Sequence, residues 1–239
     1  MSIARNLDTV REAVQKAESA SGRTAGSVKL LAVSKFHPAE SVIEAVRAGQ
    51  TLFGENRVQE AAEKFARVNE ILVTEKPLPE LHIIGALQRN KVKSALAVSH
   101  CVQSVDRIEL LDEIQKHARA LGAKISVFFE IRTGEKSKSG FDSEEKLAEC
   151  IQSASSMSHI ECAGFMTIAP FTEDVRVIRT SFSECAETAR KMRKLFPALP
   201  LAELSMGMSG DFTIAIEEGS TMVRIGTAIF GSRDSGGTP

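Results

Sequence analysis

Short β-branched runs alternate with amphipathic stretches along almost the whole chain. The apolar runs that predict strands span residues 28–34, 51–53, 81–85, 101–104, 124–131, 160–168, 202–206 and 221–225. Eight strand–helix pairs within 239 residues agree with the size of a (β/α)8 TIM barrel, about 250 residues. We therefore expect an α/β fold with a closed parallel barrel. The open, doubly wound sheet is the alternative, because it has the same alternation.

Capping residues predict where several helices begin and end. Pro38 stands at the start of one amphipathic stretch. Asp106, with a glutamate three residues later, is typical of an N-cap, and Gly122 is expected to end the same helix. Ser209 is expected to cap a helix that ends at Gly219.

No Pro- or Ser-rich linker divides the chain into two domains. We expect a single domain over residues 1–239, in which residues 1–20 form an extra N-terminal helix and residues 232–239 form a flexible tail. A chain of this length buries roughly 70% or more of its unfolded surface, so its core requires neither a metal nor a disulfide.

The charge balance argues against two classes of partner. Lys and Arg total 30 and Asp and Glu total 31, whereas binding to nucleic acid or to an anionic membrane surface requires a basic excess. No apolar run approaches the ~18 residues of a membrane span, and the charged N-terminus lacks the apolar segment of a signal peptide. We therefore expect a cytoplasmic protein without nucleic-acid or membrane partners.

The cysteines and histidines form no pattern typical of a disulfide or metal site. The four cysteines make no Cys-x-x-Cys motif, so reduced thiols are expected. The five histidines show no His-Glu-x-x-His or comparable spacing, and no metal site is predicted.

Lys35 follows the first predicted strand, at the end where barrels place their functional groups. Leu31, Val33 and Lys35 share one face of this strand because side chains alternate with a period of two. The amine should therefore point toward the opening of the barrel, where it can act as a nucleophile toward a carbonyl group. The alternative is a solvated lysine just past a strand end.

Arg224 is a charge inside the otherwise apolar last strand, with Val223 and Ile225 on the opposite face. A guanidinium buried without a partner is costly, so it should meet an acceptor inside the barrel. That acceptor is either a carboxylate of the chain, such as Glu55 or Asp106, or an atom of a ligand.

Small residues follow the seventh and eighth predicted strands. The loop after the seventh begins at Ser205-Met206-Gly207, and Gly226-Thr227 follow the eighth. Backbone N–H groups there can approach a ligand, and barrels commonly bind phosphate at these two loops. A nucleophilic lysine, an arginine and a phosphate site together favour a phosphorylated aldehyde, and pyridoxal 5′-phosphate (PLP) is the one that proteins most often hold.

At these residues the sequence resembles the pyridoxal phosphate homeostasis family, also called the YggS or proline synthetase co-transcribed family. The resemblance covers residues 28–231. It rests on the segments LAVSK at 31–35, FGENRVQE at 53–60, HIIG at 82–85, LQRNK at 87–91, GFMTIAP at 164–170, LSMGMS at 204–209 and GSTMVRIGTAIFG at 219–231. One departure is Arg57, which stands where the family frequently has tyrosine.

The resemblance implies a barrel similar to the cofactor domain of alanine racemase, without the second β-domain of that enzyme. It implies that Lys35 holds PLP covalently as an internal aldimine and that Arg224 faces the pyridine nitrogen. Residues after the seventh and eighth strands would bind the phosphate, and Asn56 would approach the ring. The cofactor-binding residues that we predict are Lys35, Asn56, Ser205, Met206, Arg224, Gly226 and Thr227.

Two functions compete. The resemblance implies a carrier for intracellular PLP homeostasis that has no catalytic residue, and the alternative is a PLP-dependent amino-acid racemase of the alanine racemase type. Racemisation needs an acid–base group on each face of the substrate. The racemase uses a tyrosine, and this chain contains none; His82 or Cys162 could replace it, so the alternative stays open. A Schiff-base aldolase is a third possibility that the motifs disfavour.

We expect a monomer whose partners are PLP and, beyond it, PLP-dependent apoenzymes. The sequence assigns no role to Gln88. Lys91 and Lys136 lie in polar stretches and are expected to be solvated.

Overall fold

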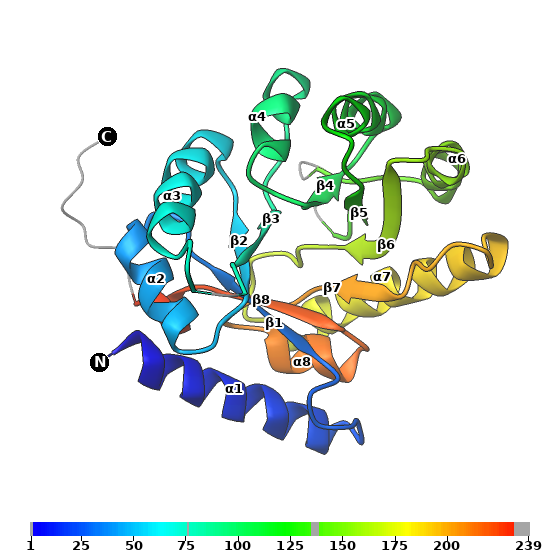
Figure 1. The fold of residues 1–239 in the computed structure, drawn as a ribbon. Helices are drawn as coiled ribbons and strands as arrows, with labels where there is room; N and C mark the ends of the chain where they lie inside the picture. The colour runs from blue at the N-terminus through cyan, green and yellow to red at the C-terminus, as the bar shows by residue number, and fades with distance from the viewer. Residues whose placement is uncertain (1, 76, 135–138, 232–239) are drawn as a thin grey trace.

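The computed structural model describes residues 2–75, 77–134 and 139–231, which form a closed barrel of parallel strands surrounded by helices (Figure 1). The strands follow one another around the barrel in chain order. Their bounds are β1 Lys29–Val33, β2 Leu52–Glu55, β3 Glu80–Ile83, β4 Cys101–Val105, β5 Ile125–Glu130, β6 Ile160–Met166, β7 Glu203–Ser205 and β8 Met222–Ile225. Each strand overlaps one of the runs that the sequence predicted.

Pairing between the first and last strands closes the sheet. Leu31 of β1 aligns with Arg224 of β8, and Ala32 aligns with Ile225. This pairing leaves no open edge, so the TIM-barrel prediction is confirmed and the open, doubly wound sheet is wrong. The carboxyl ends of all the strands consequently meet at one rim, where barrels place their functional groups.

Helices cover the outside of the barrel. Their bounds are α1 Ile3–Ala20, α2 Ala39–Arg47, α3 Val58–Ile71, the 3₁₀ turn η1 Arg89–Lys91, α4 Val92–Leu96, α5 Ile108–Leu121, α6 Glu144–Ser155, α7 Val175–Leu195, α8 Phe212–Glu217 and α9 Thr227–Phe230. In Figure 1, α1 lies beside α8 at the lower edge of the barrel. The Asn6 amide of α1 also donates a hydrogen bond to the Ile229 carbonyl of α9 (2.8 Å). The predicted extra N-terminal helix is thus confirmed.

The apolar core has two layers, because side chains on each strand alternate between the two faces of the sheet. Most buried apolar side chains lie between the strands and the helices, including Val223 and Ile225. Since Arg224 lies between these two on β8, its side chain points into the barrel interior. The smaller interior cluster consists of Leu31, Val33, Cys101, Phe128, Met166 and Met222.

The helix boundaries agree with the predicted signals at Pro38 and Gly122 and differ at Asp106. Pro38 directly precedes α2, and Gly122 follows α5 with a left-handed φ of 62°. Arg107, not Asp106, occupies the N-cap position of α5, without a side-chain cap bond. The Asp106 carboxylate pairs instead with the Arg107 guanidinium, so it does not cap the helix.

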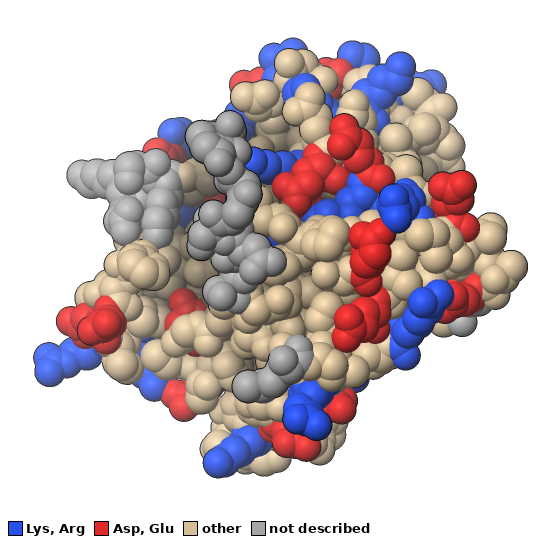
Figure 2. Space-filling view, turned by 90° about the vertical axis from the view of Figure 1, so that its left-hand side faces the viewer, with Lys and Arg blue, Asp and Glu red and all other residues tan. Residues whose placement is uncertain are grey.

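The described residues contain no helix long and apolar enough to cross a membrane. They also contain no group of three or more His, Cys, Asp or Glu side chains that could hold a metal ion. The four cysteines are buried and free. On the face shown in Figure 2, acidic and basic side chains are interspersed among uncharged ones. The predicted flexible tail at 232–239 and Lys136 lie outside the described residues.

Candidate functional site

A pocket of about 470 Å³ opens at the carboxyl ends of the strands. It brings together five of the seven predicted cofactor-binding residues, from the ends of β1, β2 and β8. These are Lys35, Asn56, Arg224, Gly226 and Thr227. Ligand pockets enclose about 300–1,000 Å³, so this one has room for a single small molecule.

Lys35 stands two residues beyond the end of β1. Val33 and Lys35 both line the pocket, as the period of two predicts. Lys35 is half-buried, and its ammonium group has no hydrogen bond or ion pair with the described residues. The amine is therefore available to a ligand in the pocket.

Arg224 is a buried cation without a carboxylate partner among the described residues. Its Nη1 donates to the carbonyl (2.6 Å) and hydroxyl (2.9 Å) oxygens of Ser205, and its Nη2 donates to the Thr167 carbonyl (2.8 Å). The alternative of an ion pair with Glu55 or Asp106 is wrong, because those carboxylates pair with other cations. Burial lowers the pKa of the Arg224 guanidinium to about 10, so it stays charged at neutral pH.

A chain of hydrogen bonds fixes Arg224 from inside the barrel. The Ser205 hydroxyl donates to Gln103 Oε1 (2.7 Å), and Gln103 Nε2 donates to His82 Nδ1 (2.7 Å). His82 Nε2 then donates to Glu80 (3.0 Å), and this bond lowers the pKa of the Glu80 carboxyl. Sequence reasoning missed Gln103, although a glutamine in the middle of an apolar strand is a signal for an internal polar contact.

Ser205 and Met206, the other two predicted residues, lie below the pocket and do not line it. Both side chains are buried. The Ser205 hydroxyl is held between Gln103 and Arg224, and Met206 packs in the outer apolar layer. Ser205 is therefore linked to the pocket indirectly, through its hydrogen bond with Arg224.

The wall after β7 is formed by the loop that contains Met208, Ser209 and Gly210. Ser209 caps no helix, because Asp211 occupies the N-cap position of α8. The Met208 N–H donates to Asp211 Oδ1 (2.5 Å), whereas the N–H groups of Ser209 and Gly210 have no acceptor within the described chain. Two unpaired backbone donors thus border the pocket.

Asn56 contributes an oxygen without a partner. Its Oδ1 is buried and has no hydrogen bond to the described residues. Gly85 allows this placement, because a Cβ there would lie 2.5 Å from the Asn56 carbonyl oxygen. Buried polar atoms are nearly always hydrogen-bonded in folded proteins, so this oxygen indicates a place for a ligand or water.

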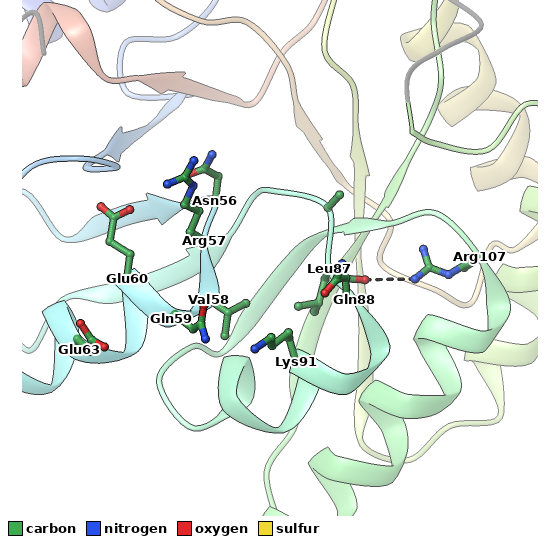
Figure 3. Close-up of a pocket in the computed structure, with 11 residues that line it drawn as sticks. Asn56, Arg57, Val58, Gln59, Glu60, Glu63, Leu87, Gln88, Lys91 and Arg107 are labelled. Carbon is green, nitrogen blue, oxygen red and sulfur yellow. Dashed lines mark hydrogen bonds between the residues drawn. The ribbon is translucent and has the colours of Figure 1, made fainter. Parts of the chain in front are cut away.

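A second pocket of about 640 Å³ adjoins the first, because Asn56 lines both. Figure 3 shows Arg57 beside Asn56, with Gln88 and Lys91 farther along the wall. The Arg57 guanidinium lies 5.0 Å from the centre of the Phe36 ring. Gln88 and Lys91 therefore lie next to the candidate site rather than in it.

Neither of the two candidate replacements for tyrosine reaches the first pocket. Cys162 packs in the outer apolar layer, and burial raises its pKa to about 11. His82 lies inside the barrel with both ring nitrogens bonded. The pocket does contain His37, which sequence reasoning missed. His37 lies on the same loop as Lys35, and the centre of its ring lies 5.2 Å from the centre of the Phe230 ring.

Sequence comparison finds similar proteins over nearly the whole chain. A pyridoxal phosphate homeostasis protein of Aquifex aeolicus is 36% identical over 233 residues, which cover 98% of this chain and 99% of the relative. The protein of the same name in Escherichia coli K12 is 38% identical over 239 residues, covering 97% of each. The family described as alanine racemase, N-terminal domain, matches residues 3–234.

Solved structures show the same architecture. PipY of Synechococcus elongatus PCC7942, with PLP bound, has a TM-score of 0.83 and 34% identity, covering 96% of this chain and 100% of that one. Alanine racemase from Corynebacterium glutamicum, with a TM-score of 0.61 and 20% identity, covers 99% of this chain and 62% of that one and shares the fold. The chain therefore belongs to the pyridoxal phosphate homeostasis protein family, within the alanine racemase N-terminal domain family.

Proposed function

We propose that this protein binds PLP and acts as a PLP carrier in intracellular PLP homeostasis. The observation that carries the proposal is the pocket at the rim, where an unpartnered lysine amine, a buried guanidinium and unpaired backbone N–H groups meet. The name of the relatives and the PLP bound to PipY support the same ligand.

Each part of PLP has a counterpart in the pocket. Lys35 Nζ forms a Schiff base with the aldehyde, with loss of water. Arg224 donates to the pyridine nitrogen, since a guanidinium is a donor only, and Asn56 contacts the ring. The loops at 209–210 and 226–227 donate backbone hydrogen bonds to the phosphate. When bound, PLP supplies an electrophilic carbonyl that no side chain of the protein has.

We further propose that the protein carries out no efficient catalysis. No tyrosine exists in the chain, and His37, the histidine of the pocket, comes from the same loop as Lys35 rather than from an opposing wall. An arginine retains its own proton, so the ring nitrogen beside Arg224 withdraws electrons weakly. The second candidate is a weak racemase, which the match to the alanine racemase N-terminal domain favours.

The proposal includes a monomeric, single-domain, cytoplasmic protein that exchanges PLP with PLP-dependent apoenzymes. Light scattering on the purified protein tests the monomer. Mixing the loaded protein with an apoenzyme and following the recovery of that enzyme's activity tests the transfer.

Borohydride reduction of the loaded protein, followed by peptide mapping, tests the covalent attachment. We expect the pyridoxyl mass on Lys35 and its loss in Lys35→Ala, with an unchanged circular dichroism spectrum. A modification confined to Lys91 or Lys136 would contradict the assignment.

Proton exchange at Cα of free amino acids in deuterated water separates the carrier from the racemase. We expect exchange far slower than about 1 s⁻¹, the lower end of ordinary turnover rates. Exchange at that rate or faster, abolished in Lys35→Ala, would establish an enzyme. Parallel loss in His37→Ala would then identify the second base, whereas His82 and Cys162 do not line the pocket.

Pyridoxal, which lacks the phosphate, tests the phosphate-binding loops. Each charge-assisted hydrogen bond contributes about 1.5–3 kcal/mol, so two of them predict binding weaker by roughly two orders of magnitude or more. Equal affinity for pyridoxal and PLP would show that these loops bind no phosphate.

A further inference from the structure

The loop that carries Lys35 rests on a charge cluster in which Glu55 and Lys64 are buried and Glu60 is partly exposed. Glu55 ends β2, and the other two lie on α3. The Lys64 ammonium donates to Glu55 Oε1 (2.8 Å), to Glu60 Oε1 (3.0 Å) and to the Ser34 carbonyl (2.8 Å). An ammonium has three donors, so all of them are used, and the Lys64 side chain is only 6% exposed.

Both chain neighbours of Lys35 are bonded to this cluster. The Ser34 hydroxyl donates to Glu55 Oε1 (2.7 Å). On the other side, the Phe36 N–H donates to Glu60 Oε1 (2.6 Å). The Ser34 side chain and the Phe36 backbone, on either side of Lys35, are therefore each held by a carboxylate that also binds the Lys64 ammonium.

Phe36 needs this support because its backbone is strained. Its φ is 67°, in the left-handed region that favours glycine. Such a conformation costs about 1–3 kcal/mol and persists only when the surroundings enforce it. The Glu60 carboxylate holds this conformation by accepting the hydrogen bond of the Phe36 N–H. Relaxation of the Phe36 backbone would rotate Lys35, the residue before it.

Stability of the loop does not by itself account for the charged side chains of this cluster. Burying the Glu55 carboxylate with the Lys64 ammonium is often no more stabilising than packing apolar side chains of the same size. Glu55 Oε2 is buried without a hydrogen-bond partner in the described residues. None of the three side chains lines the pocket that contains Lys35, although Glu60 lines the adjoining pocket (Figure 3). Their contact with the Lys35 pocket is therefore through the loop.

We propose that Glu60 and Lys64 are positioning residues that set the direction of the Lys35 amine in the cofactor pocket. The inference rests on the proposed function, because it concerns the reaction of Lys35 with PLP. It predicts that the reactivity of Lys35 depends on Glu60 through one acceptor oxygen, rather than through the stability of the fold.

Three variants on one helix test the proposal. Glu60→Ala removes the acceptor, Glu60→Gln keeps an oxygen for the Phe36 N–H, and Glu63→Ala is the matched control, because Glu63 is exposed and makes no bond to the described residues. Stopped-flow absorbance measures Schiff-base formation at a fixed PLP concentration. Reductive methylation of Lys35 by formaldehyde and cyanoborohydride, read by mass spectrometry, measures the amine in PLP-free protein.

We expect both reactions to slow about tenfold or more in Glu60→Ala, the effect of one charged hydrogen bond. Glu60→Gln should recover most of the rate, and Glu63→Ala should match the wild type. Rates in Glu60→Ala equal to the control would overturn the inference, as would equal losses in Ala and Gln. Wild-type protein that takes no pyridoxyl group on Lys35 would instead contradict the proposed function.

A second variant tests Lys64 without leaving a buried charge unpaired. Lys64→Met alone strands the Glu55 carboxylate, so we combine it with Glu55→Gln. We expect the double variant to fold and to show the same slow methylation of Lys35. A folded double variant with the wild-type methylation rate would remove Lys64 from the proposal.

Discussion

Two buried cations near Lys35, Lys64 and Arg224, have different kinds of hydrogen-bond acceptor. Lys64 lies outside the barrel wall and binds two carboxylates and a carbonyl. Arg224 lies inside the barrel and binds only carbonyl and hydroxyl oxygens in the described part of the chain. Carboxylates neutralise a cation within the protein, whereas neutral acceptors leave its charge for a ligand. Lys64 is therefore suited to hold the protein together, and Arg224 to hold a ligand.

The largest expected effect is the loss of stability in Lys64→Met. Breaking a buried ion pair from one side typically costs about 3–5 kcal/mol, because a buried charge stays behind. Urea unfolding of the PLP-free protein measures it. Lys93→Met, an exposed lysine on α4 without a partner in the described residues, is the control. A loss below about 1 kcal/mol, as for a surface pair, would remove the contrast between the two cations.

Arg224→Met should affect the affinity for PLP more than the stability of the fold. We expect PLP to bind about 10–100-fold more weakly, the effect of one charged hydrogen bond. The free energy of unfolding should fall less than in Lys64→Met, because only neutral oxygens lose their donor. Titration of PLP by absorbance and urea unfolding give the two quantities. The comparison fails if Arg224→Met loses more stability than Lys64→Met and binds PLP normally.

Ser205→Ala should have a smaller effect on PLP affinity, because Ser205 acts through Arg224. The bond lost to the Arg224 guanidinium is charge-assisted and contributes about 1.5–3 kcal/mol. Arg224 keeps its bonds to two carbonyl oxygens, so only part of this loss reaches the ligand, and we expect a few-fold to about tenfold weaker binding. A double-mutant cycle with Arg224→Met distinguishes the route. We expect Ser205→Ala to add little in that background. Additive effects would mean that Ser205 affects PLP binding by a route that does not pass through Arg224.

The smallest effect concerns the pH dependence of stability. Burial raises the pKa of Glu55 above the ordinary value of 4.5, although Lys64 and Ser34 oppose the shift. The folded state then binds more protons than the unfolded state from pH 4.5 up to the raised value, so stability falls as the pH rises through this window. Glu55→Gln should make that fall shallower in urea unfolding, whereas Glu63→Gln should not. The same pH dependence of the free energy of unfolding in both variants would contradict the raised pKa of Glu55.

The sequence predicted the barrel and most of the pocket for a local reason. Strand and helix periods are set by neighbouring residues, and parallel strands place their carboxyl ends at one rim. Lys35, Asn56, Gly226 and Thr227 follow predicted strands, Arg224 lies inside the last one, and all five line the pocket. The predicted N-cap at Asp106 failed because its carboxylate pairs with Arg107, and the one at Ser209 failed because Asp211 holds the N-cap position of α8.

The remaining site residues depend on contacts between distant parts of the chain. Gln103 meets Ser205 across a separation of 102 residues, and no local pattern indicates that pairing. Lys64 appears in the sequence as one more charge on an amphipathic helix, and only the packing of α3 against the barrel buries it on Glu55.

The sequence by itself therefore determined the order of strands and helices, the residues at the rim and the absence of a tyrosine, since these follow from composition and short-range periodicity. The tertiary structure alone decided between the expected barrel and the open sheet, through the pairing of β1 with β8, and which acceptor each buried charge finds. Both depend on side chains far apart in the chain, whose burial makes an unpaired polar group too costly to tolerate.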